Sequence, residues 1–125
     1  MPLAKSFRDL VDDAKTRIVE IAPSDLAAKL TATDGAPVII DVREAEDYNA
    51  GHVAGSRSVP RGVLELKIDE VVPDTDTEIV LYCGGGSRSA LAADTLQTMG
   101  YTNVKSLTGG FHSWSNDPSR AVETG

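Results

Sequence analysis

The chain has 125 residues, and 41% of them are hydrophobic, which is enough for the core of one domain without disulfide bonds. A net charge of −7 at pH 7 without a basic patch argues against nucleic-acid binding, and one cysteine with two distant histidines argues against a zinc site. No apolar run approaches the roughly 20 residues that span a bilayer, and the N-terminus lacks the apolar segment of a signal peptide. We therefore expect a soluble cytoplasmic protein with no membrane segment.

Strand and helix patterns alternate along the chain. In chain order we predict a helix over 6–15, a strand over 18–21, a helix from Pro23-Ser24, a turn at Asp34-Gly35, a strand over 37–42, a helix over 44–50, a strand over 56–59, a helix over 62–68, a strand over 77–82, a helix over 87–99, a strand over 104–107 and a helical turn over 111–114. This alternation predicts an α/β fold with a mainly parallel sheet.

The pattern also divides the chain into three parts. Residues 1–17 are expected to form a helical extension, residues 18–116 the compact domain, and residues 117–125 a polar tail that frays. Ser24 is placed to cap the second helix through its hydroxyl group. The apolar run over 37–42 does not alternate with polar residues, which is typical of a strand covered on both faces in a parallel sheet.

The only cysteine follows the apolar strand that ends at Tyr82, and three glycines separate it from the start of a helix. Such a loop turns successive backbone N–H groups inward, and the helix N-terminus adds partial positive charge. A thiolate is stabilised there, so we expect the pKa of Cys83 to lie below the ordinary value of about 8.5. The pattern indicates a nucleophilic Cys83 that faces an anion, although a buried structural cysteine remains the simpler alternative.

Asp41 ends one predicted strand and Cys83 follows another. Ligands of parallel α/β sheets bind beyond the carboxyl ends of the strands. If both strands belong to one parallel sheet, these two residues share the same rim.

Three stretches, in this order, carry a family resemblance. They are Asp41-Val42-Arg43-Glu44 with Tyr48, Gly51-His52-Val53-Ala54-Gly55-Ser56 and Val59-Pro60-Arg61-Gly62; Tyr82-Cys83-Gly84-Gly85-Gly86-Ser87-Arg88-Ser89; and Leu107-Thr108-Gly109-Gly110-Phe111 with Trp114. Together they resemble the rhodanese domain of sulfurtransferases from about Ile18 to Trp114. The resemblance implies a five-stranded parallel sheet flanked by helices on both faces, with the cysteine loop as the active site.

The resemblance also implies a reaction, that of a thiosulfate sulfurtransferase. Cys83 would attack the outer sulfur of an anionic donor such as thiosulfate, carry that sulfur as a persulfide, and deliver it to a thiophilic acceptor such as cyanide or a thiol. Covalent catalysis by a thiolate needs neither a metal nor an organic cofactor, so none is expected. Backbone N–H groups between Gly84 and Ser89 are suited to bind both the donor and the persulfide.

Substrate-binding residues are expected around this loop: Gly84, Gly85, Gly86, Ser87, Arg88, Ser89, Asp41 and Arg43. Arg88 could bind the donor, or it could pair with a carboxylate that braces the loop. Asp41 and Arg43 could orient the site or form a purely structural ion pair. Ser87 and Ser89 are also placed to cap the helix that follows. His52 could act as a base, or it could brace the backbone between two glycines.

Two further functions remain open. Glycines stand at positions 84 and 85, where some thiosulfate-using members carry cations, so a sulfur-relay or protein-interaction module loaded by a protein partner is one alternative. The other is a phosphatase or arsenate reductase. Four residues separate Cys83 from Arg88, whereas the related cysteine-dependent phosphatases place five between Cys and Arg, and this chain has Ser89 at that position. The shorter loop favours a terminal sulfur over a phosphoryl group.

Overall fold

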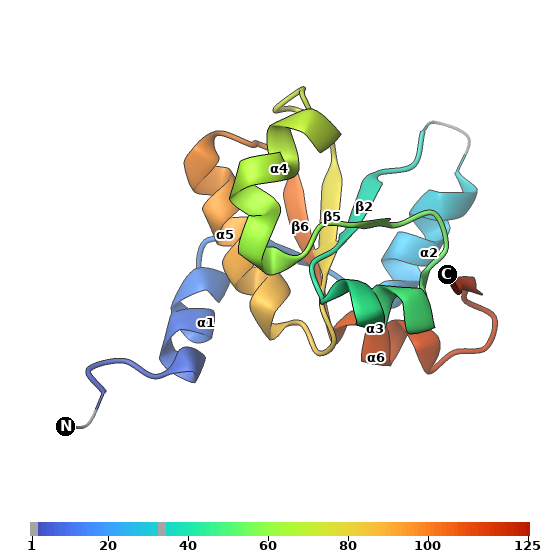
Figure 1. Cartoon of the computed structure of the whole chain (residues 1–125), viewed down its shortest axis with the longest axis horizontal. Helices are drawn as coiled ribbons and strands as arrows, with labels where there is room; N and C mark the ends of the chain where they lie inside the picture. The colour runs from blue at the N-terminus through green and yellow to red at the C-terminus, as the bar shows by residue number, and fades with distance from the viewer. Residues whose placement is uncertain (1–2, 33–34) are drawn as a thin grey trace.

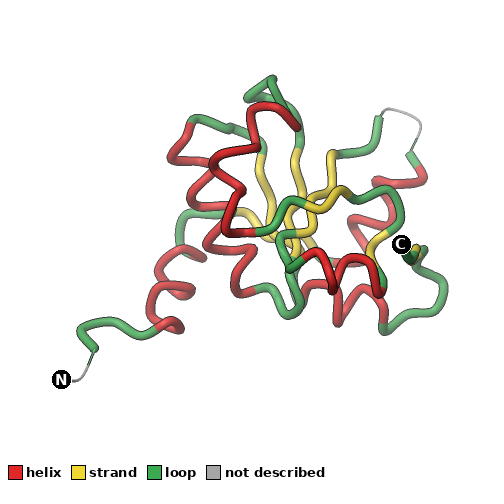
Figure 2. The backbone as a smooth tube through the Cα atoms, in the orientation of Figure 1, coloured by secondary structure: helices red, strands yellow, loops and turns green. Residues whose placement is uncertain are grey.

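Five parallel strands form the centre of the molecule (Figures 1 and 2). The structure is a computed structural model that describes residues 3–32 and 35–125. Across the sheet the strands follow the order β1 (Val19–Ile21), β6 (Val104–Leu107), β5 (Ile79–Tyr82), β2 (Val38–Asp41) and β4 (Arg57–Ser58). All pairs are parallel, which confirms the five-stranded sheet expected from the sequence.

The strands β2 and β5 lie side by side at the middle of the sheet and end at the same level. Asp41 is in register with Tyr82, and the Val42 amide donates to the Tyr82 carbonyl at 2.9 Å. Cys83 follows directly, so Asp41 and Cys83 share one rim, as expected from the topology.

Helices cover both faces of the sheet (Figure 1). On one face, α4 (Leu64–Val71) and α5 (Ser87–Met99) bury Leu64, Ile68 and Leu96 against the strands. On the other, α2 (Pro23–Thr31) and α6 (Gly110–Ser115) bury Leu26 and Trp114. The adjacent residues Ile39 and Ile40 belong to opposite cores, which explains why the strand lacks alternation in its sequence.

The remaining helical elements connect and flank this core. They are α1 (Phe7–Lys15), α3 (Ala45–Ala50) and the 3₁₀ turn η1 (Arg61–Val63). Of these, α1 packs against α5. None of the helices within residues 3–32 and 35–125 is long and apolar enough to cross a membrane.

Two local expectations are corrected by the structure. Ser24 does not cap α2: the helix begins at Pro23 after Ala22, so Ser24 already lies within its first turn. Proline suits that first position because its fixed φ matches the helix and it has no N–H to satisfy. Asp34 of the predicted turn at Asp34-Gly35 lies outside the described residues.

The expectation that residues 117–125 fray is wrong. Residues Val122–Glu123 form β7, which pairs in antiparallel register with β3 (His52–Val53). The Trp114 indole N–H donates to the Ala121 carbonyl at 3.1 Å, which fixes the segment before β7. The sequence of this segment is polar and does not predict a strand. Its ordered structure depends on β3 and Trp114, which lie earlier in the chain.

Candidate active site

Cys83 lies at the end of β5, and only 2% of the residue is exposed. Its Sγ accepts hydrogen bonds from the amides of Gly86 at 3.2 Å and Ser89 at 3.4 Å. The loop between them curls around the sulfur into the N-terminus of α5. This curl needs glycine at 86, where φ is +97° and a Cβ would lie 3.1 Å from the Gly109 amide nitrogen.

These donors control the protonation of the thiol. Burial alone raises the pKa of Cys83, because it disfavours the charged thiolate. The Ser89 hydroxyl and the amides of Ser89, Gly86 and Gly85 reverse that effect and hold the pKa below its ordinary value. The site therefore stabilises the thiolate more than an ordinary cysteine environment does, as the sequence predicted.

The first residues of α6 hold the cysteine loop from behind. The amide of Phe111 donates to the Cys83 carbonyl at 2.8 Å, and the amide of His112 donates to the Gly84 carbonyl at 3.0 Å. Gly110 makes this approach possible: φ is +58°, and a Cβ there would collide with the Cys83 carbonyl oxygen and lie 2.7 Å from that of Gly84. With these two carbonyls bound to α6, the loop presents N–H groups to its mouth.

Within the described part of the chain, the amides of Gly84, Ser87 and Arg88 have no hydrogen-bond acceptor. They lie in the loop around Cys83 or in the first turn of α5, where helix amides have no intrahelical partner. The loop thus combines a cysteine of lowered pKa with several unpaired donors, an arrangement suited to an anion beside the sulfur.

The two serines of the loop do not cap α5. Its N-cap is Gly86, which provides no side-chain hydrogen bond. The Ser89 hydroxyl instead lies 2.8 Å from Ser106 Oγ and 3.6 Å from Cys83 Sγ. It faces the sulfur because the first turn of α5 points residue 89 inward, toward the sheet.

The side chain of Arg88 is exposed and forms no hydrogen bond or ion pair with any residue in 3–32 or 35–125. The bracing pair that the sequence left open for Arg88 is thus not seen in that part of the chain. Its guanidinium group is available to solvent at the start of α5.

Asp41 and Arg43 form a buried ion pair behind the loop. Arg43 Nη2 donates to Asp41 Oδ2 at 2.8 Å and to the Gly51 carbonyl at 2.7 Å, and its guanidinium carbon lies 4.5 Å from the centre of the Phe111 ring. Asp41 is completely buried. This geometry matches the structural pair that the sequence analysis gave as one alternative.

His52 lies outside the cysteine loop. Its Nδ1 donates to the Tyr48 carbonyl at 2.8 Å, its ring stacks on Tyr48, and its Nε2 lies 3.7 Å from a carboxylate oxygen of Glu123. These contacts agree with a bracing role for His52 rather than that of a base.

Sequence reasoning missed Ser106. It lies on β6, is fully buried, and reaches the sulfur only through Ser89. The available signal was the position of Ser106 two residues after Val104, because alternate residues of a strand share one face.

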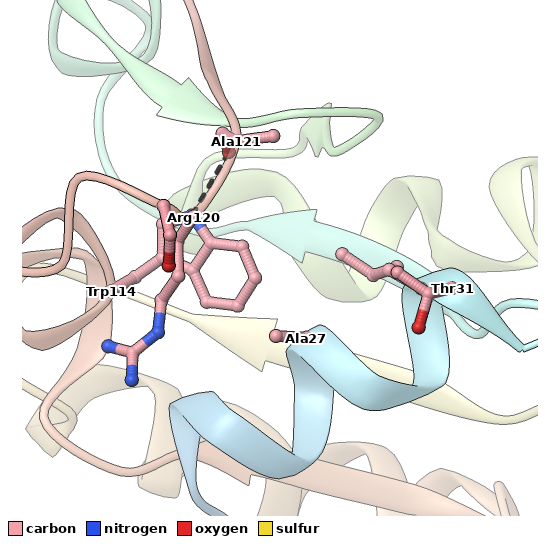
Figure 3. A pocket seen from close by; sticks show the side chains of 7 residues that line it. Ala27, Thr31, Trp114, Arg120 and Ala121 are labelled. Atoms are coloured by element: carbon pink, nitrogen blue, oxygen red, sulfur yellow. Dashed lines mark hydrogen bonds between the residues drawn. The ribbon is translucent and has the colours of Figure 1, made fainter.

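A separate cavity of about 140 Å³ lies between α2, α6 and the C-terminal segment (Figure 3). Its walls include Ala27, Leu30 and the Trp114 ring, with Arg120 at its edge. None of its lining residues belongs to the cysteine loop.

Comparison with known proteins connects this site to a family. The family model of the rhodanese-like domain matches residues 22–117, which is most of the chain. The chain belongs to the rhodanese-like family. This confirms the resemblance found in the sequence, and the family supports sulfur transfer as the general class of activity.

Individual relatives differ in how much of their length is matched. The thiosulfate sulfurtransferase GlpE of Pseudomonas putida is 35% identical over 92 residues, covering 74% of this chain and 81% of that protein. The uncharacterized protein YqhL of Bacillus subtilis is 40% identical over 76 residues, but the match covers 61% of this chain and only 59% of YqhL. A solved structure from Rhodopseudomonas palustris, described as a protein of unknown function and possible tyrosine phosphatase, has a TM-score of 0.89 at 31% identity, covering 98% of both chains.

Proposed function

We propose that this rhodanese-like chain transfers a sulfane sulfur from thiosulfate or a persulfide-type donor to a thiophilic acceptor through a Cys83 persulfide. The observation that carries the proposal is the Cys83 sulfur itself, which accepts two backbone N–H bonds inside a loop that has further unpaired donors. These groups stabilise a thiolate and an incoming anion without a metal or an organic cofactor.

The reaction consists of two displacements at sulfur. In the first, the Cys83 thiolate attacks the outer sulfur of thiosulfate: a new S–S bond forms, the old S–S bond breaks, and sulfite leaves with its electron pair. In the second, cyanide or a thiolate attacks the outer sulfur of the persulfide, and the Cys83 thiolate is released. The charge stays next to the loop amides throughout, so no proton transfer to His52 is required.

We assign positioning roles, rather than direct contact with the donor, to Asp41 and Arg43. Their pair is buried and joined to Gly51 and Phe111, so it holds the base of the loop. Arg88 is the cation of the cysteine loop and is assigned to attract the donor, because it is exposed next to Gly84 and Ser87, whose amides have no acceptor in the described part of the chain.

Intact mass spectrometry of the reduced protein tests the proposal. After incubation with thiosulfate, the wild-type chain should gain one sulfur atom and lose it again when cyanide is added. Cys83→Ser should gain none, because the serine hydroxyl stays protonated and cannot attack. If the wild type stays unloaded with thiosulfate but gains sulfur from a low-molecular-weight persulfide, the relay alternative replaces thiosulfate turnover. If neither donor loads Cys83, sulfur transfer is wrong.

Phosphatase activity is the second candidate, because the Rhodopseudomonas palustris neighbour is described as a possible tyrosine phosphatase. The loop of this chain argues against it, since four residues rather than five separate Cys83 from Arg88. Hydrolysis of p-nitrophenyl phosphate is expected to stay at the level of Cys83→Ser. A Cys83-dependent rate above that level would favour the phosphatase.

A further inference from the structure

Ser106 and Ser89 form a chain of two hydroxyl groups that ends at the Cys83 sulfur. Ser106 comes from β6 and Ser89 from the first turn of α5, and both are fully buried. Their oxygens are 2.8 Å apart, and the Ser89 oxygen lies 3.6 Å from Cys83 Sγ. Ser106 has no contact of its own with the sulfur among the hydrogen bonds of the described residues.

The protonation state of the sulfur fixes the direction of these hydrogen bonds. Each hydroxyl has one proton to donate. Next to a thiolate, the Ser89 proton points to Sγ, so the proton between the two serines must come from Ser106. Next to a neutral thiol, Cys83 can donate to Ser89, and Ser89 can then donate to Ser106.

Without the Ser106 hydroxyl, no donor to the Ser89 oxygen remains among the described residues to favour donation from Ser89 to Cys83 Sγ. The Ser89 oxygen would lose its own hydrogen-bond donor, and its hydroxyl would bind the anion less strongly, because hydrogen bonds in a chain polarise one another. At 0% exposure, bulk water does not reach Ser89 or Ser106 to substitute for the missing partner.

We propose that Ser106 is a positioning residue that directs the Ser89 hydroxyl at Cys83 Sγ and so stabilises the thiolate, both as the resting nucleophile and as the leaving group when the persulfide gives up its sulfur. The leaving-group part rests on the proposed sulfur transfer. The thiolate part does not.

The two half-reactions should respond differently to the loss of Ser106. A thiolate that is less stabilised is more basic, so it is a somewhat better nucleophile once formed and a poorer leaving group. Loading by thiosulfate above the thiol pKa should therefore be unchanged or slightly faster. Release of sulfur to cyanide should slow several-fold, because charge returns to Sγ in that step.

The test is the pH profile of Cys83 alkylation by iodoacetamide, which reports the thiolate whether or not sulfur transfer occurs. Ser106→Ala should move the midpoint up by about 0.5 to 1 pH unit while the plateau rate at high pH does not fall. Ser106→Thr, which keeps a hydroxyl, should stay near the wild type. Ser56→Ala is the matched control, because Ser56 is also buried but bonds to Tyr82 and not to the loop.

A double substitution tests whether Ser106 acts through Ser89. Ser89→Ala removes the direct donor, so adding Ser106→Ala to it should shift the midpoint no further. Circular dichroism checks that each variant is folded. If Ser106→Ala does not fold, Ser106→Val provides a second variant without the hydroxyl, because valine has a high β-propensity. An unshifted midpoint in a folded variant without the hydroxyl overturns the proposal. Absence of a persulfide on the wild type would instead overturn the proposed function and leave the alkylation result standing.

Discussion

Arg43 is a charged side chain enclosed by the rings and backbone behind the cysteine loop. Asp41 supplies its carboxylate, and the two groups meet through contacts of 2.8 to 3.2 Å. Burying two charges is costly in itself, and removing one partner leaves the other uncompensated in a medium of low polarity. The net contribution of the pair to stability is therefore small, but the loss of either partner is strongly destabilising.

Asp41→Asn should lower the free energy of unfolding by about 3 kcal/mol, because it leaves the buried Arg43 guanidinium without a counter-charge. Urea denaturation followed by circular dichroism measures the loss. Glu65→Gln is the control: its partner Arg61 lies 2.8 Å away, but the Arg61 and Glu65 side chains are 29% and 48% exposed, so the expected change is below about 0.5 kcal/mol. Equal effects of the two substitutions would contradict the assigned role of the buried pair.

Two short glycine segments, one after β5 and one after β6, interlock to form the site. Gly86 approaches Gly109, and Gly110 approaches the carbonyls of Cys83 and Gly84. Backbones can come this close only where no Cβ intervenes. The start of α6 is in this sense part of the cysteine loop, although more than 20 residues of sequence separate the two segments.

Gly110→Ala should reduce Cys83-dependent sulfur loading more than tenfold, because the new Cβ would force α6 away from the Cys83 and Gly84 carbonyls. The loading rate is followed by intact mass after mixing with thiosulfate. Gly55→Ala separates this clash from backbone strain: Gly55 also has a positive φ, +83°, but a Cβ at this position would have no neighbouring atom within 4 Å. Gly55→Ala is expected to lose stability while its folded fraction loads normally. A Gly110→Ala variant that loads at the wild-type rate would show that α6 does not hold the loop.

The helix α1 precedes the region matched by the family and still joins the folded body. Val11 and Ala14 are buried, α1 contacts α5, and Arg17 bonds to Asp94 through two nitrogens, at 3.0 and 2.8 Å. Its first turn is fixed by a capping box between Ser6 and Asp9. These contacts lead us to propose that α1 unfolds together with the domain rather than as a loose extension.

Val11→Ala should lower the free energy of unfolding by about 1 to 2 kcal/mol, since it removes two buried methyl groups between α1 and α5. The single tryptophan, Trp114, lies in the core on the opposite face of the sheet, so its fluorescence reports on unfolding far from the substitution. Leu10→Ala on the same helix is the control, because Leu10 is 46% exposed, and it should change stability by less than half as much. A Val11→Ala variant whose Trp114 transition is unchanged would place α1 outside the cooperative unit.

Most of the fold follows from the sequence, because apolar patterning and turn residues act locally. The uninterrupted apolar run at Ile39-Ile40 predicts a strand inside a parallel sheet. The apolar spacing after the cysteine loop predicts the helix α5. Local chemistry also predicts that the pKa of Cys83 is lowered, since the amides that donate to its sulfur lie within six residues of it.

The tertiary structure decides what depends on partners far along the chain. The order of the C-terminal segment comes from β3, the inward-facing amides of the loop depend on α6, and the second hydroxyl behind the sulfur comes from β6. Hydrogen bonds act over about 3 Å, so which groups meet is set by the packing of the strands and helices rather than by neighbouring residues. The sequence thus determined the cysteine loop and its place at the sheet, and the packing determined which groups hold that loop in place.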